Sequence, residues 1–171
     1  MQFSDPLAYF ITWACYGTRL HGDERGTVDR EHNIYGTPTI RPAARRVEER
    51  RSQLKEEPFV IGSTERGAIE SAIRKTCDLR GWVLRALNVR TNHVHVVVCA
   101  LVSPEKVMND LKAWSTRYMR DAKIIGPARR VWTRHGSTRR CWNEGQLTAA
   151  IRYVLEGQGT DLPKDWFERA E

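Results

Sequence analysis

The sequence lacks the features that mark membrane-bound, secreted or disulfide-stabilised proteins. Its four cysteines are widely spaced and form no C-x-x-C pair, which argues against a disulfide framework or a cysteine-rich zinc site. No apolar run approaches the roughly 20 residues needed to cross a bilayer, and the N-terminus lacks the basic-then-apolar order of a signal peptide. We therefore expect reduced thiols, a cytoplasmic location and no membrane partner.

Positive charge is what the sequence has in excess. The 171 residues include 28 Lys and Arg against 21 Asp and Glu, which gives a formal charge of +7 and a pI near 9.5. A basic domain of this size often binds a polyanion, and arginine suits phosphates and stacked bases. The arginines gather in two segments: Arg41, Arg45, Arg46, Arg50 and Arg51 in one, and Arg129, Arg130, Arg134, Arg139 and Arg140 in the other. Nucleic acid is the predicted partner, although such clusters can also be solvated faces.

The pattern of apolar residues predicts a single α+β domain over residues 1–171. Residues 17–58 are rich in Gly, Pro, Asp and Arg and form a predicted irregular insertion after the first strand, with a short charged helix within 42–55. The other predicted elements are strands at 7–16, 82–90 and 93–101, helices at 64–79, 103–123 and 143 to about 156, and a strand-like segment at 129–142. Strands joined by a tight turn are antiparallel. The predicted fold is therefore a ferredoxin-like antiparallel sheet with helices packed on one face.

Local signals predict where the helices begin. Thr64 is the expected N-cap of the first core helix, and Ser103 followed by Pro104 begins the second. Asn143 and Gln146 have capping-box spacing before the last helix. In the second helix, residues at i, i+4, i+7 and i+11 predict a core stripe made of Val107, Leu111, Trp114 and Tyr118.

The run NHVHVVV over residues 92–98 carries the clearest chemical signal. Residues two apart on a strand point to the same face, so His93 and His95 project side by side, roughly 7 Å apart at Cα. The alternate valines Val94, Val96 and Val98 point the other way, into a core. Two imidazoles at this spacing can bind one divalent ion, although two histidines packed or exposed on a strand would give the same pattern. The preceding asparagine is expected to shape the turn.

A tyrosine on the last predicted helix could supply a nucleophile beside that ion. Within residues 145–159, Tyr153 lies about 120° from the centre of the apolar stripe, so the core does not require it there. A phenolic oxygen beside a divalent cation can attack a phosphodiester, and the covalent intermediate stores the bond energy for rejoining. Glu156 follows one turn later, and Gln158 lies two residues further. Tyr118 is the rival nucleophile, but its place on the predicted core stripe favours a structural role.

The motif NHVHVVV, followed by the helical AAIRYVLEGQ, resembles the single-tyrosine HUH transposases. This family comprises the insertion-sequence 200/605 group and the REP-associated tyrosine transposases. The segments YFITWACYGTRLHGDERGTVDREHNIYG and VWTRHGSTRRCWNEGQLTAAIRYVLEGQG also resemble REP-associated relatives, so the likeness covers nearly the whole chain. The resemblance implies the HUH endonuclease fold and a DNA transposition enzyme that cuts single strands next to hairpins.

The resemblance also implies roles for individual residues. His93 and His95 match the family's paired metal ligands, with Mg²⁺ or Mn²⁺ as the cofactor. Tyr153 matches the tyrosine that becomes linked to a 5′-phosphate and leaves a free 3′-OH. The family's third ligand is usually Gln or Asn four residues after the tyrosine, a position that is glycine here. Gln158 is therefore the first choice for the third ligand, and Glu156 is the second.

Several interpretations stay open beside this one. The predicted DNA contacts are Arg134, Arg139, Arg140, His135, Arg45 and Arg46. The partner would be single-stranded or hairpin DNA, and the protein could act as a monomer or a homodimer. A non-cleaving nucleic-acid-binding protein derived from such an enzyme is one alternative. A zinc hydrolase using the two histidines with Cys99 or Cys141 is another.

Overall fold

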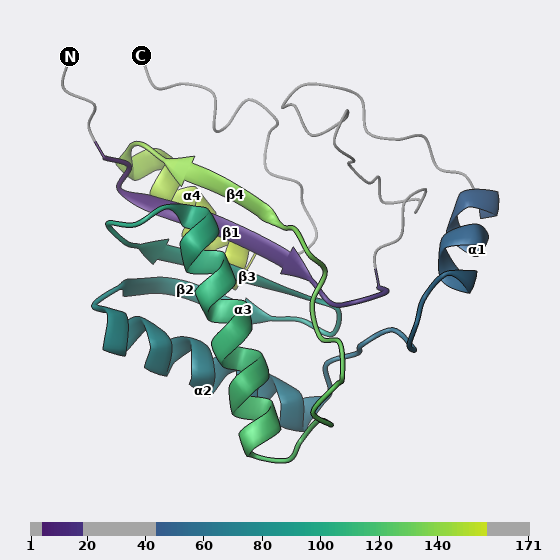
Figure 1. The fold of residues 1–171 in the computed structure, drawn as a ribbon. Coiled ribbons are helices and arrows are strands. Elements are labelled where there is room, and N and C mark those ends of the chain that lie inside the picture. Colours follow the sequence, from purple (N-terminus) through teal and green to yellow (C-terminus); the bar gives the residue numbers. More distant parts are fainter. Residues whose placement is uncertain (1–4, 19–43, 157–171) are drawn as a thin grey trace.

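The computed structural model describes residues 5–18 and 44–156, which build a four-stranded sheet with helices on both sides (Figure 1). Its strands are β1 (Ala8–Ala14), β2 (Val83–Val89), β3 (His93–Cys99) and β4 (Ser137–Cys141), in the spatial order β2-β3-β1-β4. Every pairing between neighbouring strands is antiparallel. The α+β class and the antiparallel sheet predicted from the sequence are confirmed.

The helices form one layer on each face of the sheet. α2 (Ser63–Arg80) and α3 (Pro104–Asp121) cover one face, and α4 (Glu144–Leu155) covers the other (Figure 1). The prediction of helices on one face therefore holds for α2 and α3 but not for α4, whose apolar side packs on Phe10, Ala86 and Val97. α1 (Ala44–Ser52) occupies the place of the short charged helix expected within the insertion. Across the described ranges, none of these helices has both the length and the apolar character that crossing a membrane requires.

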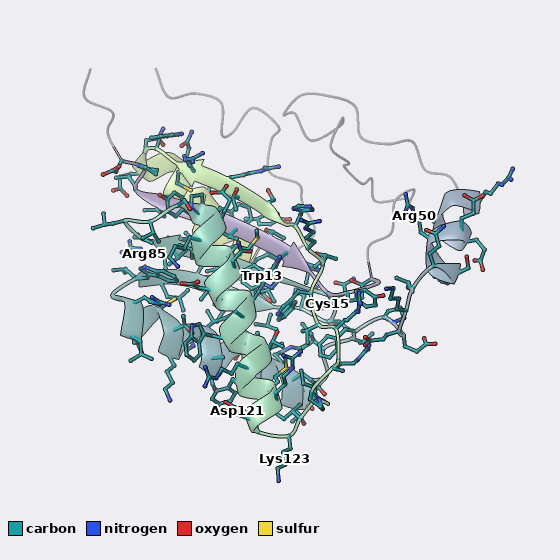
Figure 2. All side chains as sticks on the ribbon, viewed as in Figure 1. Trp13, Cys15, Arg50, Arg85, Asp121 and Lys123 are labelled. Atoms are coloured by element: carbon teal, nitrogen blue, oxygen red, sulfur yellow. The ribbon has the colours of Figure 1, made fainter. Side chains whose placement is uncertain are left out.

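The strands divide their side chains between two cores of unequal size. The larger core lies under α2 and α3 and includes Ile11, Trp13, Ile69, Ile73, Val94, Val96, Val98, Val107 and Leu111. In Figure 2, Trp13 lies between β1 and α3. The smaller core lies under α4 and consists of Ala8, Phe10, Ala86, Val97, Cys141, Leu147, Ala150 and Val154. Because side chains alternate along β3, three valines enter the larger core while the two histidines face the other way.

Two of the three predicted helix starts are confirmed. The Ser103 hydroxyl accepts from the Lys106 backbone N at 3.3 Å, with Pro104 in the first turn of α3. Asn143 Oδ1 accepts from the Gln146 backbone N at 2.9 Å and caps α4, but the Gln146 side chain accepts from the N–H of Trp142, not from that of Asn143.

The prediction that Thr64 caps α2 is wrong, because the helix begins one residue before it. Gly62 is the N-cap residue of α2. Glu65 Oε2 accepts from the Gly62 backbone N at 3.1 Å. A carboxylate reaching back from the first turn therefore replaces the hydroxyl cap that the sequence suggested.

The predicted core stripe of α3 is only half right. Val107 and Leu111 are fully buried, but Trp114 and Tyr118 each remain 41% exposed. The helix instead buries Met108, Lys112, Ser115 and Met119. Since each residue advances about 100° around a helix, Trp114 and Tyr118 lie at the margin of the buried arc. Tyr118 also lies in the helix layer on the face of the sheet opposite the two histidines, so the sheet separates it from them.

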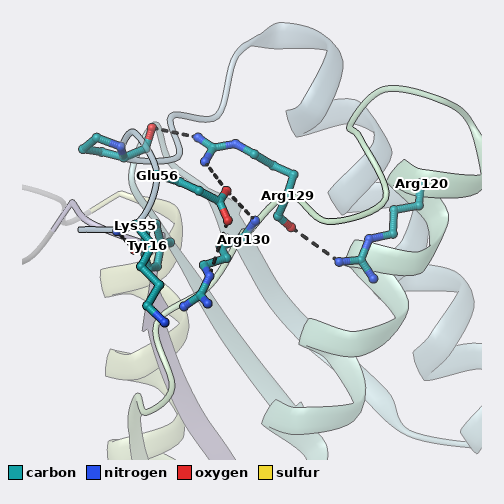
Figure 3. A network of polar contacts seen from close by, with 7 residues as sticks. Tyr16, Lys55, Glu56, Arg120, Arg129 and Arg130 are labelled. Carbon is teal, nitrogen blue, oxygen red and sulfur yellow. Dashed lines mark hydrogen bonds and ion pairs between the residues drawn. The ribbon is translucent and has the colours of Figure 1, made fainter. Parts of the chain in front are cut away.

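An ion-pair network fastens the segment after α1 to the loop that follows α3 (Figure 3). Glu56 Oε2 accepts from Arg129 Nη1 at 2.9 Å and from the Arg130 backbone N at 3.1 Å. Arg120 Nη2 donates to the Arg129 carbonyl oxygen at 3.4 Å, and the Arg130 guanidinium lies over the Tyr16 ring. These contacts join parts of the chain that are far apart in sequence.

Candidate active site

The two histidines of β3 lie side by side on the face that α4 covers. The His93 and His95 ring centroids are 4.5 Å apart, with the rings nearly perpendicular. His95 is 6% exposed, whereas His93 is half-buried at the start of the strand. The shared face predicted from their spacing is therefore confirmed.

Each histidine has a side-chain oxygen beside its Nδ1 atom. Thr12 Oγ1 lies 2.8 Å from His95 Nδ1, and Asn92 Oδ1 lies 2.6 Å from His93 Nδ1. Thr12 reaches His95 because these residues are direct partners in the β1–β3 pairing. Metal-binding histidines usually hold their second ring nitrogen in such a hydrogen bond, which fixes the ring orientation. The pair therefore fits a cation bound through the two Nε2 atoms.

Asn92 has a structural contact in addition to its contact with the imidazole. Its carbonyl oxygen accepts from the Cys15 backbone N at 2.8 Å and from the Thr18 hydroxyl at 3.2 Å. Asn92 therefore has the turn-shaping role that the sequence predicts, and its side chain also lies at the candidate site. The backbone contact ties the end of β1 to the start of β3, so the asparagine side chain is presented from a fixed frame.

Tyr153 of α4 contacts the same surroundings. Its ring centroid lies 5.7 Å from that of His95 and 5.7 Å from that of Phe10, edge to face in both cases. Phe10 stacks on His95 at 5.9 Å. The three aromatic rings therefore meet in one cluster that joins β1, β3 and α4. The half-buried Tyr153 is close to the histidines, as the sequence predicted.

The end of α4 that carries Tyr153 is attached to the edge strand β2. Asn88 Nδ2 donates to the Val154 carbonyl oxygen at 2.9 Å. Asn88 is also the β2 partner of His95, whose partner on β1 is Thr12. A polar row thus crosses the sheet beneath the last turn of α4. A carbonyl near a helix end has no partner within the helix, so a side-chain donor is effective there.

The predicted basic contacts divide into two groups. Arg139 pairs with Phe10 across β1 and β4, so it shares the face of the aromatic cluster, whereas Arg140 pairs with Tyr9 and points to the opposite face. Arg134 and His135 are exposed in the loop before β4. The structure therefore brings Arg139 beside the candidate site and places Arg140 away from it.

The remaining predicted site residues are exposed or lie outside the described residues. Glu156 is exposed at the C-terminal end of α4. Arg45 is exposed on α1 and pairs with Glu49 at 3.1 Å. The first choice for the third ligand, Gln158, lies outside the described residues, and so does the side chain of Arg46.

Cys99 and Cys141 also face α4, but their environment disfavours thiolate ligands. Burial raises the pKa of Cys141 to about 11, and Cys99 adds to that rise. Burial likewise raises the pKa of Cys99. Zinc binds the thiolate, not the thiol. Over residues 5–18 and 44–156, no three His, Cys, Asp or Glu side chains gather as a metal-binding group. The zinc-hydrolase interpretation therefore has no ligand set in this part of the chain.

Three residues of this site escaped the sequence reasoning: Thr12, Phe10 and Asn88. Thr12 and Phe10 lie in the first strand, where a single threonine among apolar residues resembles an ordinary β-branched packing residue. Their alternation with the buried Ile11 and Trp13 is the one local signal that they share a second face. Only the pairing of β1 with β3 shows that this face is the one with the histidines.

Comparisons with known proteins give one matching family model and two solved structures of similar fold. The family model for IS200-like transposases matches residues 47–153, which is more than half of the chain. A candidate transposase from Deinococcus radiodurans R1 has 16% identity and a TM-score of 0.47, with 92% of this chain and 95% of that chain covered. A REP-associated tyrosine transposase bound to a REP hairpin has 11% identity and a TM-score of 0.50, with 90% and 67% covered. No curated protein sequence matches the chain.

Proposed function

Because the chain belongs to the family of IS200-like transposases, we propose that it nicks and rejoins single-stranded DNA next to hairpins through a 5′-phosphotyrosine at Tyr153. The contact between Tyr153 and His95, with ring centroids 5.7 Å apart, is the observation that carries this proposal. It puts a phenol beside two imidazoles on one face of the sheet. A nucleophile and a pair of metal-ligand side chains are the two components that such chemistry requires.

The proposed reaction exchanges one phosphodiester for another. The Tyr153 oxygen attacks the scissile phosphorus, the bond from phosphorus to the 3′ oxygen breaks, and the phenolic proton ends, in net, on that leaving oxygen. The products are a DNA 5′-phosphate joined to Tyr153 and a free 3′-OH. Attack by a 3′-OH of another strand reverses the step and releases the tyrosine. No high-energy cofactor is needed, because the covalent bond conserves the free energy of the original link.

His93 and His95 would hold Mg²⁺ or Mn²⁺, with Gln158 as the preferred third ligand and Glu156 as the second choice. Such an ion, when bound, polarises the phosphate and offsets the charge that develops in the transition state. The oxygens of Thr12 and Asn92 orient the two imidazoles through their Nδ1 atoms. Phosphate oxygens and water would complete the oxygen-rich coordination that these cations prefer.

The proposed substrate is a hairpin with a flanking single strand. A structural relative, the REP-associated tyrosine transposase, is bound to a REP hairpin. The formal charge of +7 favours a polyanion. Arg139 is positioned to contact the strand near Tyr153, because it shares the face of Phe10. The other proposed DNA contacts are Arg134, His135, Arg140, Arg45 and Arg46.

One experiment tests the nucleophile. The protein would be incubated with a labelled, hairpin-flanked single strand and Mn²⁺, and adducts would be separated on a denaturing gel. We expect the wild-type protein and Tyr118→Phe to form a covalent protein–DNA adduct. Tyr153→Phe should form roughly a thousandfold less adduct or lower still, which is the order of loss typical when a catalytic nucleophile is removed. Peptide mapping would then identify the linked tyrosine.

Two results would contradict the proposal in different ways. An undiminished adduct with Tyr153→Phe would remove Tyr153 as the nucleophile. Tight hairpin binding by the wild-type protein, with no adduct under any divalent cation, would favour the non-cleaving nucleic-acid-binding alternative.

A further inference from the structure

A buried lysine holds the loop that leads into β4. Lys112 of α3 is 7% exposed, and its ammonium donates to three successive carbonyl oxygens of Thr133, Arg134 and His135. The three N···O distances are 3.1, 3.4 and 3.1 Å in that order. The loop therefore curves around a single cation, with its carbonyl groups turned inward.

This ammonium is an unusual group to bury. Among the described residues, no carboxylate pairs with Lys112. Burial lowers its pKa to about 8, which reflects the loss of hydration. An unpaired buried charge is costly unless hydrogen bonds satisfy it. The three carbonyls supply those bonds, so the lysine and the loop conformation depend on each other.

The inward carbonyls determine where the N–H groups of the loop point. In a trans peptide the N–H of each residue points opposite to the carbonyl before it, and the described chain has no cis peptide bond. The N–H groups of Arg134, His135 and Gly136 therefore point away from the buried ammonium. No oxygen within the described part of the chain accepts a hydrogen bond from them. All three residues are exposed, including the charged Arg134 side chain.

The loop runs along the part of the sheet that carries the candidate site. The Thr133 backbone N donates to the Ala14 carbonyl oxygen at 3.0 Å, and Ala14 is the strand partner of His93. Ser137 is in turn the partner of Thr12. The loop is thus separated from β3 by β1 alone, which corresponds to roughly 10 Å, or two strand spacings. A DNA strand at Tyr153 could place a neighbouring phosphate there.

We infer that residues 134–136 form a phosphate-binding site for the DNA strand that reaches Tyr153, and that Lys112 is the positioning residue that shapes it. The inference rests on the proposed function for the identity of the strand. Outward backbone N–H groups and an adjacent guanidinium bind phosphate oxygens without reading base sequence. The site holds a phosphate that is not cut, and so aligns the one that is.

The test follows the backbone amides of the loop directly. Amide resonances of the ¹⁵N-labelled full-length protein would be recorded during titration with inorganic phosphate and, separately, with a single-stranded oligonucleotide. We expect the resonances of residues 134–136 to shift with both probes. Arg134→Ala should weaken oligonucleotide binding about fivefold and lower the salt dependence by about one counterion. The matched control is Arg74→Ala, which removes an exposed arginine of α2 on the face of the sheet opposite Tyr153. This variant should bind the oligonucleotide as the wild type does.

Lys112→Met keeps most of the length of the side chain, which is one atom shorter, and removes the ammonium. We expect it to abolish the coordinated shift of the three amides and to weaken oligonucleotide binding at least as much as Arg134→Ala. If this variant does not fold, Arg134→Ala and the wild-type titration still decide the outcome. If the amide resonances of residues 134–136 do not shift in wild-type protein that still forms the Tyr153 adduct, the loop site alone is overturned. Shifted amides without any adduct would support the loop site and overturn the nicking reaction.

Discussion

Thr12 and Asn92 decide which nitrogen of each histidine faces the proposed cation. Each places a side-chain oxygen within 2.8 Å of an Nδ1 atom. If Nδ1 carries the proton and donates to that oxygen, Nε2 has its lone pair available to a metal. The two imidazoles are then oriented before a cation binds, which reduces the entropy lost on coordination.

Thr12→Val tests this orientation at the residue scale. Valine matches threonine in shape and keeps the strand packing, but it removes the oxygen next to His95 Nδ1. We expect Mn²⁺ affinity to fall about tenfold, as is typical when a residue supporting a metal ligand is lost. Isothermal titration calorimetry would measure the affinity, and Thr12→Ser should restore it. Equal Mn²⁺ affinity in all three proteins would show that the hydroxyl does not support the site.

The entry into β4 requires a close approach of two backbones. A Cβ added at Gly136 would meet the Thr12 carbonyl oxygen at 2.5 Å and Met108 Sδ at 2.6 Å. The loop shaped by Lys112 can therefore enter the sheet only through a residue without a side chain. By contrast, a Cβ at Gly126 would meet nothing within 4 Å.

Gly136→Ala should therefore destabilise the protein, whereas Gly126→Ala should leave it nearly unchanged. Overpacking a close contact of this kind typically costs about 1–3 kcal/mol in the free energy of unfolding. Urea denaturation followed by circular dichroism would measure both variants under the same conditions. Similar midpoints for the two variants would mean that β4 shifts at no cost and that the close approach is not required.

Elements whose limits depend on neighbours in sequence could be predicted from the sequence. Ser103 and Asn143 cap their helices because each bonds an N–H three residues away. The paired histidines also followed from local geometry, since two residues suffice to define a strand face. The exposed margin of α3 could not be predicted, because the packing of α2 against α3 decides which flank of the helix is covered. Trp114 and Tyr118 lie on that margin.

At the scale of the whole molecule, the site depends on strand register between distant segments. Thr12 meets His95 only because β1 and β3 pair in one register, and a shift by one residue would turn it to the other face. No pattern within either strand reveals that pairing. Asn88 and Phe10 escaped prediction for the same reason.

The Glu56 network is a second long-range link, and it is sensitive to acid. The Arg130 backbone N–H, together with the Arg129 guanidinium, lowers the pKa of Glu56 from its usual 4.5. A carboxyl whose pKa is lower in the folded state stabilises the protein above its unfolded pKa. That contribution is lost as the pH falls through the folded value.

Glu56→Gln should therefore reduce stability at neutral pH and remove part of its dependence on acid. We expect the gap between wild-type and variant urea midpoints to be constant above about pH 5 and to close as the pH falls below about 4. Glu57→Gln, an exposed neighbour in sequence, is the matched control. A gap that persists unchanged at pH 3 would show that the charge of Glu56 does not stabilise the fold.

The unequal cores on the two faces of the sheet bear on how such a protein can evolve. The packing under α2 and α3 involves many large side chains, whereas the packing under α4 is small and lies beside the proposed chemistry. If the proposed function holds, replacing Tyr153 or the histidines should therefore abolish the nicking reaction and leave the larger core intact. A single substitution could then remove the proposed reaction and leave the scaffold folded, which would make inactive descendants with the same fold readily accessible to evolution.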